Sequence, residues 1–153
     1  MKKFPKAMVA GLVATIFLSV LSVLFVMKDA MGIMPQLDLP KMIAGMMGMP
    51  DAPMAGWAVH FFIGVVVYGA ALALLDEHLP GDSKIGHGVL LATVGWLIMM
   101  AVLMPMAGAG VFGLNLGISV PIMTLMLHLI FGAILGTYFG HALARQARVP
   151  LRT

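Results

Sequence analysis

The chain has 153 residues, of which 61% are apolar and 10% are charged, and its formal net charge is +3. A water-soluble domain of this size needs more charge on its surface, so a soluble enzyme or soluble binding module is excluded. The chain has no cysteine, which excludes disulfides, thiolate metal sites and iron–sulfur clusters. At this length we predict one transmembrane domain over residues 1–153.

Four apolar segments are long enough to cross a bilayer, which takes ~20 helical residues per crossing. The longest stretch without Asp, Glu, Lys or Arg lies between Lys84 and Arg145, and it has room for two crossings and a turn. We therefore predict an all-α, four-transmembrane-helix bundle, with crossings over residues 7–27, 53–75, 87–106 and 119–143.

The first apolar segment follows a basic start, as in a signal peptide. It is longer than the usual apolar region of such peptides, and no small-x-small cleavage pattern lies close behind it. We expect it to be retained as the first helix.

Proline and short polar residues mark the helix starts. Asp51 as a cap and Pro53 as a first-turn proline predict the start of the second helix. Ser119 and Pro121 predict the start of the fourth helix in the same way. Glycine, proline and polar residues predict connections at residues 79–83 and 108–115.

The distribution of basic residues predicts the orientation. An even number of crossings puts both termini and the 76–86 turn on one side of the membrane. That side carries seven basic residues, and the other carries two: Lys2, Lys3, Lys6, Lys84, Arg145, Arg148 and Arg152 against Lys28 and Lys41. The positive-inside rule predicts that both termini are cytoplasmic, in a bacterial cytoplasmic (inner) membrane.

The loop over residues 28–51 is rich in methionine, including Met31 and Met34. Asp38 and Pro40 have the spacing of a helix start. We predict a short amphipathic helix over residues 39–47 that lies in the outer interface.

The second and fourth crossings share the pattern Pro-x6-His-x3-Gly at an offset of 68 residues: Pro53, His60 and Gly64 against Pro121, His128 and Gly132. Ala14-Thr15 and Ala92-Thr93 match in the first and third crossings. We predict a tandem duplication of a two-helix hairpin, with repeats over 7–75 and 87–143. The copies would be related by a pseudo-twofold axis along the membrane normal.

The repeated residues lie at four-residue spacing and predict one packing face on each helix. Small residues at this spacing let membrane helices approach closely. The second crossing has Gly56, His60, Gly64 and Tyr68, and the fourth has Thr124, His128, Gly132, Gly136 and Gly140.

Two histidines at matched depth inside a membrane indicate a functional site, because an ionisable side chain there is costly. His60 and His128 are suitable axial ligands for a b-type haem that carries electrons. Gly64, Gly132 and Gly136 would leave space for the macrocycle. The alternative metal is copper, which accepts imidazole and thioether ligands such as Met54 and Met126.

Other functions stay open. The histidines could be hydrogen-bonded only, with no cofactor, in a structural or accessory subunit, a homo-oligomer or part of a larger membrane complex. A small-solute or metal transporter is a further alternative. No hydrolase, kinase or dehydrogenase motif is present, so we do not expect an enzyme. His78, His87 and His141 form a second group at the opposite helix ends, where interfacial positions or a second metal site are the two interpretations.

The segment Gly56-Trp57-x2-His60-Phe61-x2-Gly64, together with four apolar spans, resembles families of small, uncharacterised bacterial inner-membrane proteins. The resemblance covers most of the chain but rests on a single specific motif. It implies the fold and the location. It carries no known activity, so it assigns no functional residue.

Overall fold

The computed structural model describes residues 3–27 and 37–147, and every regular element within these ranges is helical. Four helical segments are long and apolar enough to cross a membrane: Lys3–Leu24, Pro53–Leu75, Lys84–Met106 and Ser119–Ala147. The all-helical fold and the four candidate crossings are thereby confirmed, and the chain is a multi-pass membrane protein. Several residues of the charge and methionine patterns lie outside the described ranges: Lys2, Lys28, Met31, Met34, Arg148 and Arg152.

The first crossing is one helix, and the second is made of three segments. Helix α1 covers Lys3–Met27. The second crossing consists of α3 (Pro53–Phe62), the π-helical segment η1 (Ile63–Val67) and α4 (Tyr68–Leu75). The short helix α2 (Leu39–Met46) lies between these two crossings in the chain.

The third crossing is also interrupted, whereas the fourth is continuous. The third consists of α5 (Lys84–Ile98), the π-helical segment η2 (Met99–Leu103) and α6 (Met104–Met106). A 3-10 segment, η3 (Val111–Leu116), leads to the fourth crossing, α7 (Ser119–Ala147).

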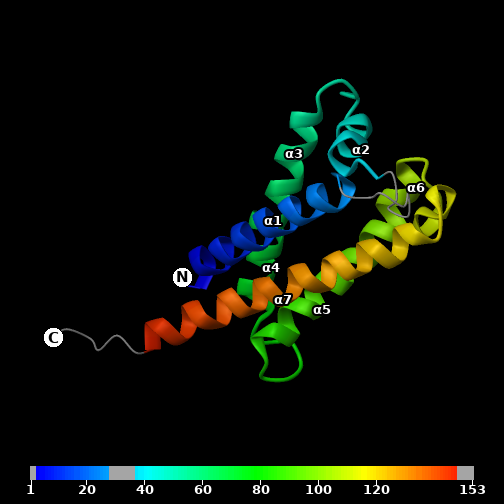
Figure 1. The fold of residues 1–153 in the computed structure, drawn as a ribbon. Coiled ribbons are helices and arrows are strands. Elements are labelled where there is room, and N and C mark those ends of the chain that lie inside the picture. Colours follow the sequence, from blue (N-terminus) through cyan, green and yellow to red (C-terminus); the bar gives the residue numbers. More distant parts are fainter. Residues whose placement is uncertain (1–2, 28–36, 148–153) are drawn as a thin grey trace.

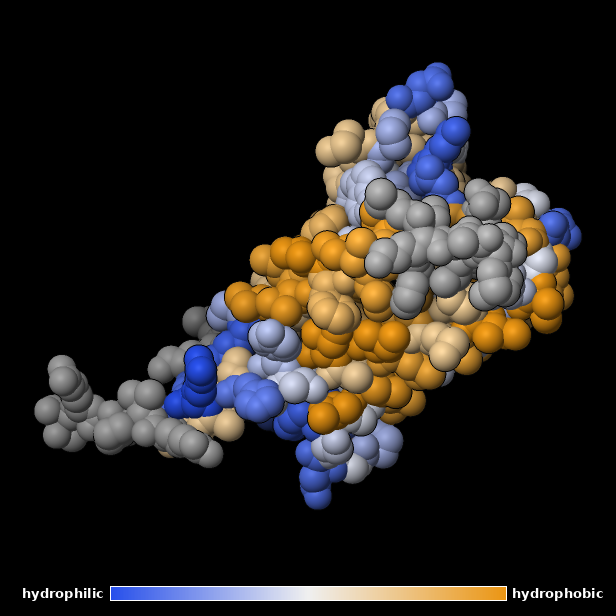
Figure 2. All heavy atoms as spheres, in the orientation of Figure 1, coloured by the Kyte–Doolittle hydropathy of each residue, from blue (hydrophilic) through white to orange (hydrophobic). Residues whose placement is uncertain are grey.

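Helices α1 and α7 lie side by side and run in opposite directions, α5 runs along α7, and α3–α4 crosses them steeply (Figure 1). The start of α1, the turn at residues 76–83 and the end of α7 share one end of the bundle. There Lys3 pairs with Glu77, and Lys6 Nζ donates to the Ala142 carbonyl at 2.9 Å. Figure 2 shows a broad apolar zone between hydrophilic residues at the two ends.

Each hairpin is held by a pair of glycines that bring two helix backbones together. A Cβ added to Gly11 would lie 2.5 Å from the Gly64 carbonyl oxygen, and Thr15 occupies the space beside Gly64. In the second hairpin, a Cβ added to Gly132 would lie 2.5 Å from the Gly88 carbonyl oxygen. Backbones this close exclude any larger side chain at these positions.

Besides the contact of α1 with α7, the two hairpins also meet at Tyr68. Its ring packs edge-on against Phe131 of α7, with 4.9 Å between the ring centroids. Its hydroxyl lies against Gly95 of α5, where a Cβ would clash with it. Tyr68 therefore joins the second crossing to both helices of the second hairpin.

The predicted packing face of the fourth crossing is confirmed, because Gly132, Gly136 and Gly140 all face α5. The single face predicted for the second crossing is wrong. Gly56 faces Pro40 of α2, and Gly64 faces α1. The π-helical turn η1 accommodates an extra residue, which rotates α4 about the helix axis relative to α3. Four-residue spacing therefore does not keep these residues on one face.

The predicted short helix is confirmed as α2, which begins at Leu39 and ends at Met46. Asp38 caps it, since its Oδ1 accepts a hydrogen bond from the Lys41 backbone N–H at 3.0 Å. Asp51, in contrast, does not cap α3 as predicted. The cap residue is Ala52, without a side-chain bond, and Pro53 is the first helical residue.

The glycine contacts give a first prediction. Gly132→Ala should lower the free energy of unfolding by about 1–3 kcal/mol, because its Cβ meets rigid backbone of α5. Thermal unfolding in detergent, monitored by circular dichroism, measures this. Gly45→Ala in α2 is the matched control, because no described atom outside its own stretch of helix lies within 4 Å of its Cβ position. Equal stability of the two variants would contradict the packing argument.

Candidate functional site

His128 lies in the half of α7 farther from the chain ends and is half-buried. Its Nδ1 is 2.8 Å from the Thr124 carbonyl oxygen, one helical turn earlier. A carbonyl only accepts hydrogen bonds, so Nδ1 carries the proton and the Nε2 lone pair is left for another partner. Metal-ligating histidines are commonly anchored in this way.

Thr124 fixes this part of α7 against α5. Its Oγ1 donates to the Val120 carbonyl at 2.7 Å and accepts from Trp96 Nε1 at 3.1 Å. Trp96 packs in turn against Phe112 of the loop segment, with ring centroids 5.6 Å apart. His128 therefore stands on a turn that is held in place.

His60 lies on α3, is half-buried and is flanked by aromatic rings of its own helix. Trp57 and Phe61 approach its ring edge-on, at centroid distances of 5.8 and 6.1 Å. Within the described ranges, the His60 ring makes no hydrogen bond. Within the described residues, no hydrogen bond or ring contact joins His60 to His128, and the main neighbour of α3 is α2 rather than α7.

The three glycines predicted to leave space for a cofactor are buried in helix contacts. The Thr15 side chain fills the space beside Gly64. The Gly88 backbone fills the space beside Gly132, and the Lys84 backbone fills the space beside Gly136. These positions bring helices together and leave no flat gap beside the histidines.

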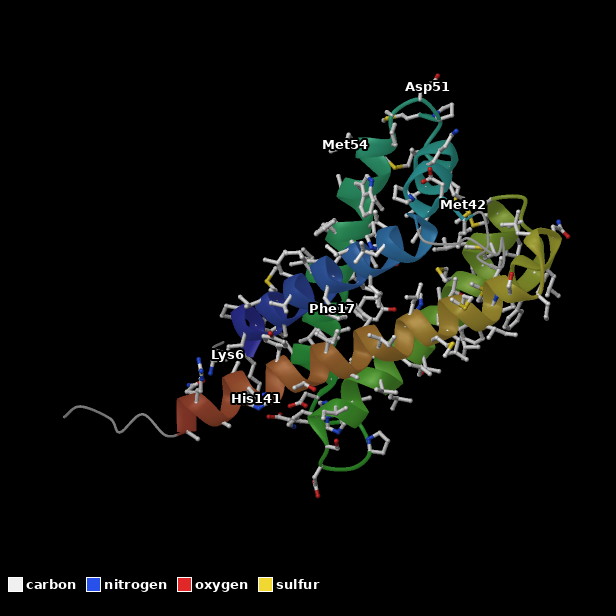
Figure 3. The ribbon with its side chains drawn as sticks, viewed as in Figure 1. Lys6, Phe17, Met42, Asp51, Met54 and His141 are labelled. Carbon is white, nitrogen blue, oxygen red and sulfur yellow. The ribbon has the colours of Figure 1, made fainter. Side chains whose placement is uncertain are left out.

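The two methionines predicted as copper ligands are on the outside. Met54 is 74% exposed and Met126 is 55% exposed. Figure 3 shows Met54 pointing away from the bundle at the start of α3. The structure therefore does not gather these thioethers around the two imidazoles. In the part of the chain that the structure covers, no group of three or more His, Asp or Glu could hold a metal ion.

A buried polar cluster, not predicted from the sequence, lies at the other end of the bundle. His87 and Asp76 are each 2% exposed, and His87 Nδ1 lies 2.8 Å from Asp76 Oδ1. His87 Nε2 lies 2.8 Å from the Gly81 carbonyl oxygen. Lys84 Nζ donates to the Asp76 carboxylate at 2.9 Å. The cluster joins the end of α4 to the start of α5.

The partners of His87 occupy both of its ring nitrogens. Nδ1 faces the Asp76 carboxylate and Nε2 faces the Gly81 carbonyl oxygen, and both of these groups only accept hydrogen bonds. Burial raises the pKa of Asp76, but hydrogen bonds from Lys84 and His87 outweigh it and hold that pKa below its usual 3.8. Both nitrogens of His87 are thus engaged by protein groups, and neither is free to bind a metal.

The rest of this second histidine group does not gather around His87. His78 and His141 are exposed, and His141 Nδ1 bonds the Thr137 carbonyl of its own helix at 2.8 Å. One signal in the sequence could have identified the cluster. The acidic residue Asp76 comes before a Pro-Gly turn, and Lys84 and His87 come after that turn.

The chain belongs to a family of unknown function (DUF6789), whose model matches residues 1–149. This agrees with the resemblance to uncharacterised membrane proteins. No curated protein and no solved structure matches the chain.

The cluster predicts that His87→Gln lowers the free energy of unfolding by about 1–3 kcal/mol, since buried Asp76 loses a hydrogen-bond partner. Thermal unfolding in detergent measures the change. His78→Gln, at an exposed position near the same turn, is the control and should change little. A double-mutant cycle with Asp76→Asn should show coupling between the two sites, and additive effects would contradict the direct hydrogen bond between them.

Asp76 also predicts a dependence on pH. Its pKa is lower in the folded than in the unfolded state, so its stabilisation is complete above pH 3.8 and is lost as the pH falls through the folded pKa. Unfolding measured from pH 7 down to pH 2 should show this loss. The loss should be smaller in Asp76→Asn, which has no carboxylate to protonate. Parallel pH profiles would refute the assignment.

Proposed function

We propose that His60 and His128 together bind one transition-metal centre inside the membrane, either a copper ion or a haem iron. The observation that carries the proposal is the anchored ring of His128, whose Nδ1 bonds the Thr124 carbonyl and leaves Nε2 to face a ligand. His60, at the matching position of the repeated Pro-x6-His-x3-Gly pattern, would supply the second imidazole. Either metal would give the protein a one-electron carrier inside the bilayer.

The packing around the glycines favours copper over haem. A b-type haem needs a flat space beside its axial ligands, and neighbouring helices occupy that space at Gly64, Gly132 and Gly136. A single Cu(I) ion accepts imidazole ligands and needs no such gap. The exposed Met54 and Met126 are left out of this proposed site.

The orientation and the repeat belong to the same proposal. The end of the bundle that holds the start of α1 and the end of α7 carries Lys3, Lys6, Lys84 and Arg145, which favours a cytoplasmic position in a bacterial inner membrane. The duplicated hairpin is supported by equivalent contacts, Gly11 on Gly64 and Gly88 on Gly132. These contacts make Thr15 the equivalent of Ala92, whereas the sequence match alone pairs Thr15 with Thr93.

A second candidate is an accessory subunit, in which the histidines are only hydrogen-bonded. The observation that favours it is the free apolar surface of the second crossing. Only 17% of its most apolar stretch is buried within the chain. Further helices, from a second copy or a larger membrane complex, could cover the rest.

The metal site predicts that protein purified after growth with copper holds about one copper ion per chain, because two imidazoles form one site. Elemental analysis measures the copper, and an absorption spectrum with a Soret band would instead identify haem. His128→Ala and His60→Ala should each lose the metal. His141→Ala is the matched control, because its ring has the same Nδ1 bond to the preceding turn but lies exposed at the other end.

Two results would contradict the metal site. One is a colourless, metal-free preparation after growth with copper and a haem precursor. The other is metal that stays bound in both His128→Ala and His60→Ala. A stable oligomer or complex in native mass spectrometry, without metal, would favour the accessory subunit.

A further inference from the structure

A groove separates the first turns of α1 from the last turns of α7. It has a volume of about 270 Å³ and is lined by six residues: Pro5, Lys6, Val9, Ala10, Tyr138 and Ala142. Apart from the Lys6 ammonium and the Tyr138 hydroxyl, this lining is apolar. Figure 3 shows Lys6, from the start of α1, and His141, next to Ala142 on α7, at this end of the bundle.

The charge of Lys6 is not balanced by an acid. Its Nζ donates to the Ala142 carbonyl at 2.9 Å and to the Gln146 side-chain oxygen, which are both neutral. An ammonium group has three N–H donors, so a third remains for another acceptor. Lys3 and Lys84 differ, because each pairs with a carboxylate.

Arg145 adds a second positive charge beside the groove. It lies three residues after Ala142 and seven after Tyr138, so all three share one face of α7. Arg145 is exposed. Within residues 3–27 and 37–147, no carboxylate lies within ion-pair distance of Arg145 or Lys6.

We propose that this groove binds an anionic phospholipid, with one acyl chain along the apolar wall and the phosphate on Lys6 and Arg145. The site combines an apolar channel with unbalanced positive charge at its mouth, and such a lipid is complementary to both. Tyr138, half exposed beside it, is a residue type typical of the membrane interface. A second copy of the chain, packed through the same face, would bring two more positive charges against Lys6 and Arg145. It is therefore less complementary to the groove than an anionic lipid.

The test is native mass spectrometry of the purified chain with equal amounts of phosphatidylglycerol and phosphatidylcholine that have the same acyl chains. Wild type should retain phosphatidylglycerol in preference. Arg145→Gln should reduce that preference about fivefold, and Lys6→Gln with Arg145→Gln about 25-fold, because each charge near the surface contributes similarly. Ala142→Phe should reduce retention of both lipids by filling the groove.

Lys41→Gln is the matched control, because it removes one exposed positive charge at the opposite end and should leave the preference unchanged. Excess inorganic phosphate should not displace the lipid, because the acyl chain contributes to binding. Thermal unfolding checks that each variant is folded. Equal retention of the two lipids, or a preference unchanged in the folded Arg145→Gln variant, would overturn the proposal. A lipid-free dimer that Ala142→Phe dissociates would also overturn it.

Discussion

The rest of the fold depends on the direct contact of helix backbones at glycine. Lipid gives no hydrophobic drive for helix association, so close van der Waals contact has to supply it. Gly11 with Gly64, and Gly88 with Gly132, place the carbonyl of one helix against the Cα of the other. Both hairpins are fixed by these contacts. The neighbouring helix occupies the space beside each glycine, so the same glycines do not leave room for a cofactor.

The polar end of the bundle is held by a different interaction. Asp76 is buried at the end of α4, and it is stable there as a carboxylate because Lys84 and His87 both donate to it. A buried charge is costly unless such bonds replace its hydration. Lys3 lies 3.9 Å from the same carboxylate, so the start of α1 is drawn to this point as well. Glycine packing thus holds the helices of each hairpin together along their length, and this charge cluster joins the end of α4 to the start of α5.

The sequence predicts the features that depend on local properties. Hydropathy gives the four crossings, and the Asp38–Pro40 spacing gives α2, because a helix start needs only a few neighbouring residues. The face of α7 results from regular spacing along an unbroken helix. The π-helical turns η1 and η2 carry no such local signal, so the rotation of the second crossing was missed. The partners of His87 were missed because they depend on how the 76–83 turn folds.

The two histidines match in sequence but not in surroundings, and the residue four positions before each of them makes different contacts. Four residues before His128 stands Thr124, which bonds Trp96 and accompanies an anchored ring. Four residues before His60 stands Gly56, which instead lets α2 pack against α3 through Pro40. The longer loop of the first hairpin therefore contains α2, which packs against α3 at this position. In the second hairpin, Trp96 of α5 contacts α7 at the equivalent position. In a shared metal site, His128 would be the preorganised ligand, and binding would have to fix the ring of His60, which makes no hydrogen bond within the described residues.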